Sequence, residues 1–120
     1  MRQITTHQTN ECNEQIELVA DDRDPDNGNA SHEYVASWDK GRCDLPIKFQ
    51  QGPILENGVN GVTNEVLLAI VIDRLEGFQT SKYACRENAI ALTKLQEAFH
   101  WLEHRTKARG ARGVEGTHKV

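Results

Sequence analysis

The sequence predicts an α+β protein in which a small N-terminal antiparallel β-sheet precedes a C-terminal antiparallel two-helix hairpin. Short alternating segments separated by turn residues fill the first half of the chain, a pattern typical of strands. Two long apolar segments, joined by a few polar residues, lie between Thr63 and Arg109. The run Val66–Ile72 is apolar at every position, so one partner helix cannot cover all sides of it. We therefore expect the protein to be oligomeric.

Composition excludes several classes of protein. A length of 120 residues allows one small domain, and 38% hydrophobic residues are enough for a globular fold. The N-terminus lacks the apolar stretch of a signal peptide, and no apolar run is long enough to cross a bilayer. Because Cys12, Cys43 and Cys85 have no short spacing, they are predicted to be free thiols in a reducing cytoplasm.

The N-terminal half is predicted to hold three or four strands. Residues 1–14 are polar and without periodicity, which favours a flexible arm. The strands are expected at 15–20, 33–38 and 45–50, with a short fourth strand at Ile54–Leu55. The predicted organisation is an arm at 1–14, a β-rich part at 15–62, and a helical hairpin with a basic C-terminal tail at 63–120.

The C-terminal half is predicted to form two helices of unequal length. The first is expected to begin with Thr63 or Asn64 as its cap and to end near Phe78. A connection of four polar residues then returns the chain antiparallel. The second helix is expected from about Tyr83 to Arg109, where the glycine that follows should end it.

Positive charge is concentrated at the C-terminal end. Residues 104–120 hold five Lys/Arg against one Glu, whereas residues 1–60 hold five against eleven acidic residues. Arg105, Arg109 and Arg112 recur at helical steps, and guanidinium groups bind phosphate oxygens bidentately. A second helix about 40 Å long separates these arginines from an aromatic at the hairpin bend. Both groups can contact one small ligand only if they come from different protomers. A simple solvated helix end remains the alternative.

Two motifs are weighed as metal sites. The segment His100–His104 has the H-x-x-E-H spacing of an inverted zinc-peptidase motif. A catalytic zinc needs a further protein ligand, and only sixteen residues follow, so catalysis is not expected; adventitious nickel or zinc binding is favoured over it. Asp22, Asp24 and Asp26 partly match a calcium loop, but Asn27 replaces its glycine, which favours a solvated acidic turn. We predict no catalytic residue, no resident metal and no cofactor.

Several spaced motifs resemble the family of phage Thoeris anti-defence protein one, which shares a helical hairpin domain with anti-CBASS protein two. The resemblance covers roughly residues 45–117. The motifs that carry it are Asn60-Gly61-Val62-Thr63-Asn64-Glu65, Asp73-Arg74-Leu75, Phe78-Gln79, Cys85-Arg86-Glu87-Asn88, Arg105-Thr106 and Arg112-Gly113-Val114-Glu115-Gly116-Thr117.

The resemblance implies a non-enzymatic protein that sequesters an immune signal in the host cell cytoplasm. The implied ligand is glycocyclic ADP-ribose, with cyclic oligonucleotides as further ligands of a homo-oligomer between a dimer and a hexamer. No membrane partner and no specific nucleic acid are expected, because the apolar runs are short and the net charge is −4. The residues that the resemblance implies for ligand binding are Phe78, Asn88 and Arg105, together with Arg86, Arg109, Arg112 and Thr117. The alternative function is a phage accessory protein whose basic tail binds nucleic acid or a host protein.

Overall fold

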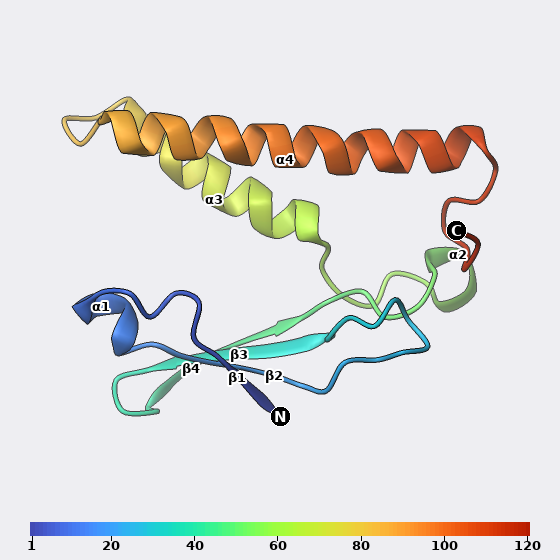
Figure 1. The fold of residues 1–120 in the computed structure, drawn as a ribbon, viewed down its shortest axis with the longest axis horizontal. Helices are drawn as coiled ribbons and strands as arrows, with labels where there is room; N and C mark the ends of the chain where they lie inside the picture. Colours follow the sequence, from blue (N-terminus) through green and yellow to red (C-terminus); the bar gives the residue numbers. More distant parts are fainter. The chain divides into compact units, whose positions relative to one another are not determined.

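The computed structural model describes residues 1–120, which divide into two compact units. The first unit comprises Met1–Gly52 with Asn57–Val62, and the second comprises Pro53–Glu56 with Thr63–Val120. The strands belong to the first unit and the two long helices to the second, so the predicted α+β class is confirmed (Figure 1). None of the helices is both long enough and apolar enough to pass through a membrane.

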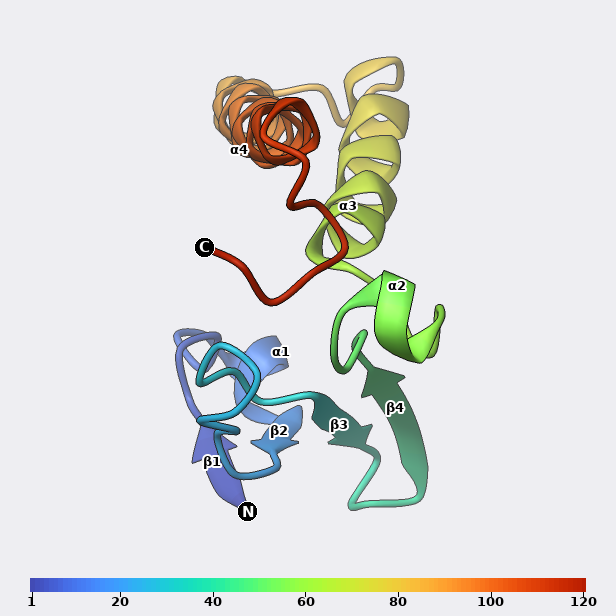
Figure 2. The same cartoon turned by 90° about the vertical axis from the view of Figure 1, so that its right-hand side faces the viewer.

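The first unit is built on a four-stranded antiparallel sheet with the order β1-β2-β3-β4 (Figure 2). Its elements are β1 (Arg2–Ile4), α1 (Glu11–Glu14), β2 (Glu17–Ala20), β3 (Glu33–Trp38) and β4 (Cys43–Lys48). Tyr34 pairs with Ala20 on β2 and with Ile47 on β4, so these three side chains share one face of the sheet. Three of the four strands thus lie where alternation predicted them, β4 beginning two residues early.

Two predictions about this half of the chain are wrong. The segment 1–14 contributes β1 and the single-turn α1; the Arg2 guanidinium also donates to the Ser31 hydroxyl at 2.8 Å. Three residues are too few to produce a recognisable alternation. The expected strand at Ile54–Leu55 is instead the start of α2 (Ile54–Asn57). Pro53 precedes that helix, and its fixed φ is compatible with a helix start.

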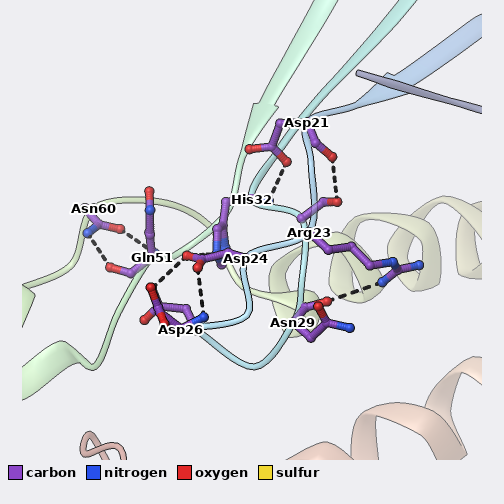
Figure 3. Close-up of polar contacts among 10 residues, drawn as sticks. Asp21, Arg23, Asp24, Asp26, Asn29, His32, Gln51 and Asn60 are labelled. Carbon is purple, nitrogen blue, oxygen red and sulfur yellow. Dashed lines mark hydrogen bonds and ion pairs between the residues drawn. The ribbon is translucent and has the colours of Figure 1, made fainter.

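The chain between β4 and the first long helix is held close to β4. The Val62 amide donates to the Lys48 carbonyl at 2.9 Å, and the Gln50 amide donates to the Val62 carbonyl at 2.8 Å. The Asn60 side chain accepts from the Gln51 amide and donates to the Gln51 carbonyl, both at 2.8 Å (Figure 3). These bonds fix the segment that leads to the first residue of the helical hairpin.

The second unit is dominated by two helices that pack together, α3 (Asn64–Gln79) and α4 (Arg86–Ala111) (Figure 1). Thr63 caps α3 as predicted, its hydroxyl accepting from the Val66 amide at 3.3 Å. Cys85 caps α4, its thiol sulfur accepting from the Asn88 amide at 3.4 Å. The Gln79 side chain accepts from the Cys85 amide at 3.1 Å and so links the end of one helix to the start of the next.

The boundaries predicted for the second helix are wrong at both ends. It begins at Arg86 rather than near Tyr83, because the Cys85 cap lies after the bend. It also continues through Gly110 to Ala111. Of Gly110 and Gly113, only Gly113 has a positive φ, +71°. The Val114 amide, which follows it, donates back to the Arg109 carbonyl at 3.0 Å. This six-to-one bond is the Schellman helix end, which requires its left-handed residue after the last helical turn.

Little apolar surface is buried in the chain. Ala20 and Val114 are the only apolar residues that are fully buried, and neither α2 nor α3 contains a fully buried residue. Within the apolar run of α3, Ile70 is 59% exposed. A monomer of this kind leaves a large apolar helix surface without a partner.

Candidate functional site

All predicted binding residues except Arg105 fall into two regions of the second unit. We call the first the hairpin bend, meaning residues 78–88, where α3 turns into α4. We call the second the tail clamp, meaning Arg109 and the tail residues 112–118, which include its partners Val114, Glu115 and Thr117. Each region is described from its own contacts.

Two aromatic rings meet at the hairpin bend. The Phe78 and Tyr83 centroids lie 6.5 Å apart with their planes at 84°, an edge-to-face pair. Phe78 is half-buried, whereas Tyr83 is 63% exposed. The Ser81 hydroxyl, which donates to the Phe78 carbonyl at 2.7 Å and accepts from the Tyr83 amide, fixes the backbone between them. The bend therefore presents an ordered aromatic surface to solvent.

Cations lie over both rings. The Arg74 guanidinium carbon is 5.1 Å from the Phe78 centroid, and the Lys82 ammonium is 5.3 Å from the Tyr83 centroid. Neither cation was predicted as a site residue. The spacing of Arg74 four residues before Phe78 on one helix is the signal that would have found it.

The first turn of α4 completes the bend. Arg86 is exposed at the positive end of the helix, and Asn88 is half-buried two residues further along. The Asn88 backbone amide is used by the Cys85 cap, while its side-chain amide makes no hydrogen bond within the chain. Aromatic rings, cations and a free amide at one helix junction match the groups that bind a nucleotide base and its phosphates.

The tail clamp is organised differently, around a buried arginine. Arg109 is 8% exposed, and its Nε donates to a Glu115 carboxylate oxygen at 3.1 Å. Its Nη2 donates to the Val114 carbonyl at 2.9 Å and to the Thr117 carbonyl at 3.2 Å. The Thr117 hydroxyl in turn donates to the Val114 carbonyl. Both Arg109 and Thr117, predicted as ligand contacts, are thus bonded within the tail.

The tail also contacts α2 in the same unit. The Leu55 amide donates to the Gly116 carbonyl at 3.2 Å, and the His118 ring lies 3.2 Å from a Glu56 carboxylate oxygen. A Cβ added at Gly116, where φ is +78°, would lie 2.8 Å from the Leu55 side chain. Close approach of tail and α2 therefore depends on glycine.

The remaining predicted arginines are exposed. Arg112 donates to the carbonyl of Val120 at 2.9 Å, whereas Arg105 makes no ion pair or hydrogen bond within the chain. The helical rise places Arg105 about 28 Å along α4 from Arg86. The hairpin bend and Arg105 therefore cannot contact the same small ligand within one chain.

An open groove lies between α3 and α4, with a volume of about 390 Å³. Its walls are Ala69, Ile72, Asp73, Glu76, Gln96 and Phe99. None of the predicted binding residues lines it. Two carboxylates beside an apolar floor make it a poor site for an anion.

Two carboxylates of the acidic turn of the first unit, those of Asp21 and Asp24, accept hydrogen bonds within it (Figure 3). Asp24 accepts from the Asn27 side chain at 2.7 Å and from the Asp26 amide at 3.0 Å, and it lies 3.1 Å from the His32 ring. The Asn27 bond, with smaller contributions from Asp26 and His32, holds the pKa of Asp24 below its ordinary value. Asp21 accepts from the His32 amide at 3.0 Å. Of the three aspartates with calcium-like spacing, Asp24 is thus the one whose carboxylate is bonded within the turn.

Comparison with known proteins agrees with this helical architecture. The family model described as Acb2/Tad1, hairpin domain, matches residues 44–107, more than half of the chain. The chain is 59% identical over 73 residues to Thoeris anti-defense 1 of Bacillus phage SBSphiJ7. That match covers 61% of this chain and 51% of the phage protein, so the chain spans about half the length of this relative. The resemblance found in the sequence is confirmed, and the chain belongs to the Acb2/Tad1 hairpin-domain family.

Proposed function

We propose that this protein is a phage anti-defence protein that binds and sequesters a cyclic nucleotide immune signal, without cleaving it, in the host cell cytoplasm. Glycocyclic ADP-ribose is the proposed ligand, and cyclic oligonucleotides are further candidates. Membership of the hairpin-domain family and the relationship to Thoeris anti-defense 1 support an anti-defence role. The observation that carries the proposal is the cation-flanked aromatic pair at the hairpin bend, in which Tyr83 is exposed and Phe78 is half-buried.

The bend has the chemistry that such a ligand needs. Phe78 offers a ring on which an adenine can stack, and Arg74 already covers part of that ring as a cation. The free side-chain amide of Asn88 can donate to and accept from a base edge or a ribose hydroxyl. Arg86, at the positive end of α4, is placed to bind a phosphate oxygen.

Arg105 is the proposed pyrophosphate contact from the far end of the hairpin. Its guanidinium has no partner within the chain, so all of its donors are available to a ligand. Arg112 is the second candidate, because its one bond is to the exposed chain end. Arg109 and Thr117 act by holding the tail in shape beside these arginines, since their polar groups are already bonded to it.

A second copy of the chain has to supply the missing half of the site. The bend and Arg105 are too far apart along α4 to meet on one ligand, so the proposed contact joins the bend of one protomer to Arg105 of its partner. The exposed apolar residues Val66, Ile70 and Val71 on α3 give the protomers a surface to bury. We propose a homo-oligomer between a dimer and a hexamer.

Sequestration fits the groups present better than catalysis does. The bend contributes rings, cations and an amide, all of them groups suited to binding. A protein that competes for a scarce signal needs a nanomolar Kd, which corresponds to about 12 kcal/mol. Stacking combined with several charge-assisted bonds in a buried seam is a reasonable source of that affinity.

Isothermal titration with glycocyclic ADP-ribose tests the proposal. We expect nanomolar binding and recovery of unchanged ligand after the protein is denatured. Binding in the micromolar range or weaker, or recovery of a cleaved product, would contradict it.

A second candidate is binding of nucleic acid or of a host protein through the basic C-terminal end. The exposure of Arg105, Arg112 and Lys119 favours it. Binding to nucleic acid should weaken steeply with salt, because each phosphate contact releases counterions. Titration of single- and double-stranded DNA at two salt concentrations distinguishes this candidate from signal sequestration.

A further inference from the structure

Two histidines of α4 flank one tryptophan on the surface. The ring centroids of His100 and His104 lie 5.7 Å and 5.5 Å from that of Trp101, both in edge-to-face orientation. Trp101 is 65% exposed, and both histidines are exposed as well. These three residues make up what we call the His–Trp patch, and the proposed signal site does not use it.

The two histidines differ from the others in the chain in their polar contacts. His7 lies 2.6 Å from the Ile16 carbonyl oxygen, His32 lies 3.1 Å from Asp24, and His118 lies 3.2 Å from Glu56. The imidazoles of His100 and His104 make no hydrogen bond and no ion pair within the chain. Their ring nitrogens therefore remain available to an external ligand.

Their spacing on the helix selects the kind of ligand. Residues four apart on an α-helix lie on the same face, one turn above the other, so both imidazoles are on one face of α4. Two imidazoles in this arrangement can ligate one metal ion, as in helical zinc motifs. Because α4 is a continuous helix of 26 residues, the spacing is fixed before any metal arrives.

We propose that His100 and His104 bind one borderline divalent transition-metal ion, such as Cu²⁺, Ni²⁺ or Zn²⁺. Nitrogen ligands favour these ions over Mg²⁺ and Ca²⁺, and affinity should follow the order in which Cu²⁺ is strongest. No cluster of three or more His, Cys, Asp or Glu side chains in the structure is placed to hold a metal. Two ligands therefore come from the protein, and water occupies the remaining coordination positions.

The neighbouring carboxylates are engaged with lysines of the same helix. Glu103 forms an ion pair with Lys107 at 3.0 Å, and Glu97 lies 3.8 Å from Lys94. This pairing favours a two-imidazole site over a mixed carboxylate site. Such a site binds metal without the geometry that hydrolysis requires, because a catalytic zinc takes three protein ligands.

Trp101 supplies a direct optical readout, since a bound paramagnetic Cu²⁺ ion would lie beside its indole. The Trp38→Phe variant, with any affinity tag removed, leaves Trp101 as the only tryptophan. Titration with Cu²⁺ is expected to quench its fluorescence saturably, and Zn²⁺ should compete. His100→Ala and His104→Ala should each weaken binding by about tenfold or more, because a single imidazole remains.

The matched control is His118→Ala, which removes an exposed histidine elsewhere and should leave the titration unchanged. The double variant His100→Ala/His104→Ala should show no saturable quenching. Alanine favours the helix, so circular dichroism should report an intact fold. Undiminished quenching in the double variant, or no saturable quenching in its parent, would overturn the proposal. If the double variant binds glycocyclic ADP-ribose as the wild type does, the metal site and the proposed signal site are independent of each other.

Discussion

Arg105 and Arg109 lie four residues apart on the same helix, yet the two regions they serve are built in opposite ways. Arg109 is buried, and its guanidinium donates hydrogen bonds to Glu115 and to two carbonyls of the tail. Arg105 is exposed and without a partner, and at the hairpin bend Tyr83 is likewise exposed and Phe78 is half-buried. An arginine that is available to a ligand is therefore identified by its lack of hydrogen bonds within the chain. The spacing of arginines along the sequence does not show this difference.

Replacing Arg105 should produce the largest loss of binding. Charge-assisted bonds contribute about 1.5–3 kcal/mol each, so Arg105→Ala is expected to weaken glycocyclic ADP-ribose binding by about 10- to 100-fold. Isothermal titration measures the loss. Because Arg105 makes no bond within the chain, its thermal unfolding midpoint should match that of the wild type. Normal affinity in this variant would remove Arg105 from the site.

Phe78→Ala tests the bend in the same way. Stacking of one base on an aromatic ring is worth about 1–3 kcal/mol, so binding should weaken by about tenfold or more. Light scattering should show the same oligomer as the wild type, which separates loss of the site from loss of assembly. Should Phe78→Ala bind the signal normally, the proposed stacking surface is wrong even though the fold is right.

Arg109→Ala should have the opposite effect to Arg105→Ala: it should lower the stability of the protein. It removes the donor to the Glu115 carboxylate and to the Thr117 carbonyl, while the Val114 carbonyl keeps its bond from the Thr117 hydroxyl. We expect a cost of about 2 kcal/mol, because Glu115 is partly solvated. Thermal unfolding followed by circular dichroism measures the effect. A variant as stable as the wild type would mean that Arg109 is not needed to hold the tail.

Two glycines give a smaller and matched test of the clamp. Gly116→Ala places a Cβ 2.8 Å from Leu55 at a φ of +78°, and it should destabilise the protein by about 1 kcal/mol. Gly110→Ala meets nothing within 4 Å inside a helix and should be neutral or stabilising by up to about 1 kcal/mol. Equal stabilities would mean that the tail is not held against α2.

The smallest effect is expected from Asp24, a carboxylate bonded internally as Arg109 is. Its folded-state pKa is lowered, so its contribution to stability is present above the ordinary value of 3.8 and is lost as the pH falls through the lower folded value. Asp24→Asn removes that contribution. Denaturant unfolding of both proteins should give stabilities that converge as the solution is acidified; a constant difference would contradict the assignment.

The long helices and three strands could be predicted because each has a repeating pattern and a turn at its ends. β1 could not, because three residues show no period. The end of α4 was misplaced because two glycines compete for it, and only the backbone distinguishes Gly113 from the helical Gly110. The Cys85 cap was missed because cysteine is not among the usual capping residues.

The contacts of the candidate site could be predicted between residues that are close in sequence. Contacts that depend on how side chains and the tail pack could not be predicted. Phe78 and Tyr83 lie on either side of a short connection, so their proximity could be inferred. The cation over Phe78 is Arg74, one turn earlier on α3, which was not among the predicted site residues. The partners of Arg109 depend on a tail that turns back after Gly113, which residue spacing does not show.

The scarcity of fully buried apolar residues has a consequence for how the stability of the protein depends on its concentration. A chain in which Ala20 and Val114 are the only fully buried apolar residues gains limited free energy from folding alone. If association with further copies supplies the remainder, stability rises with concentration by mass action. Newly made molecules would then be most sensitive to proteases while their concentration is low. Dilution alone would shift the protein towards the unfolded state.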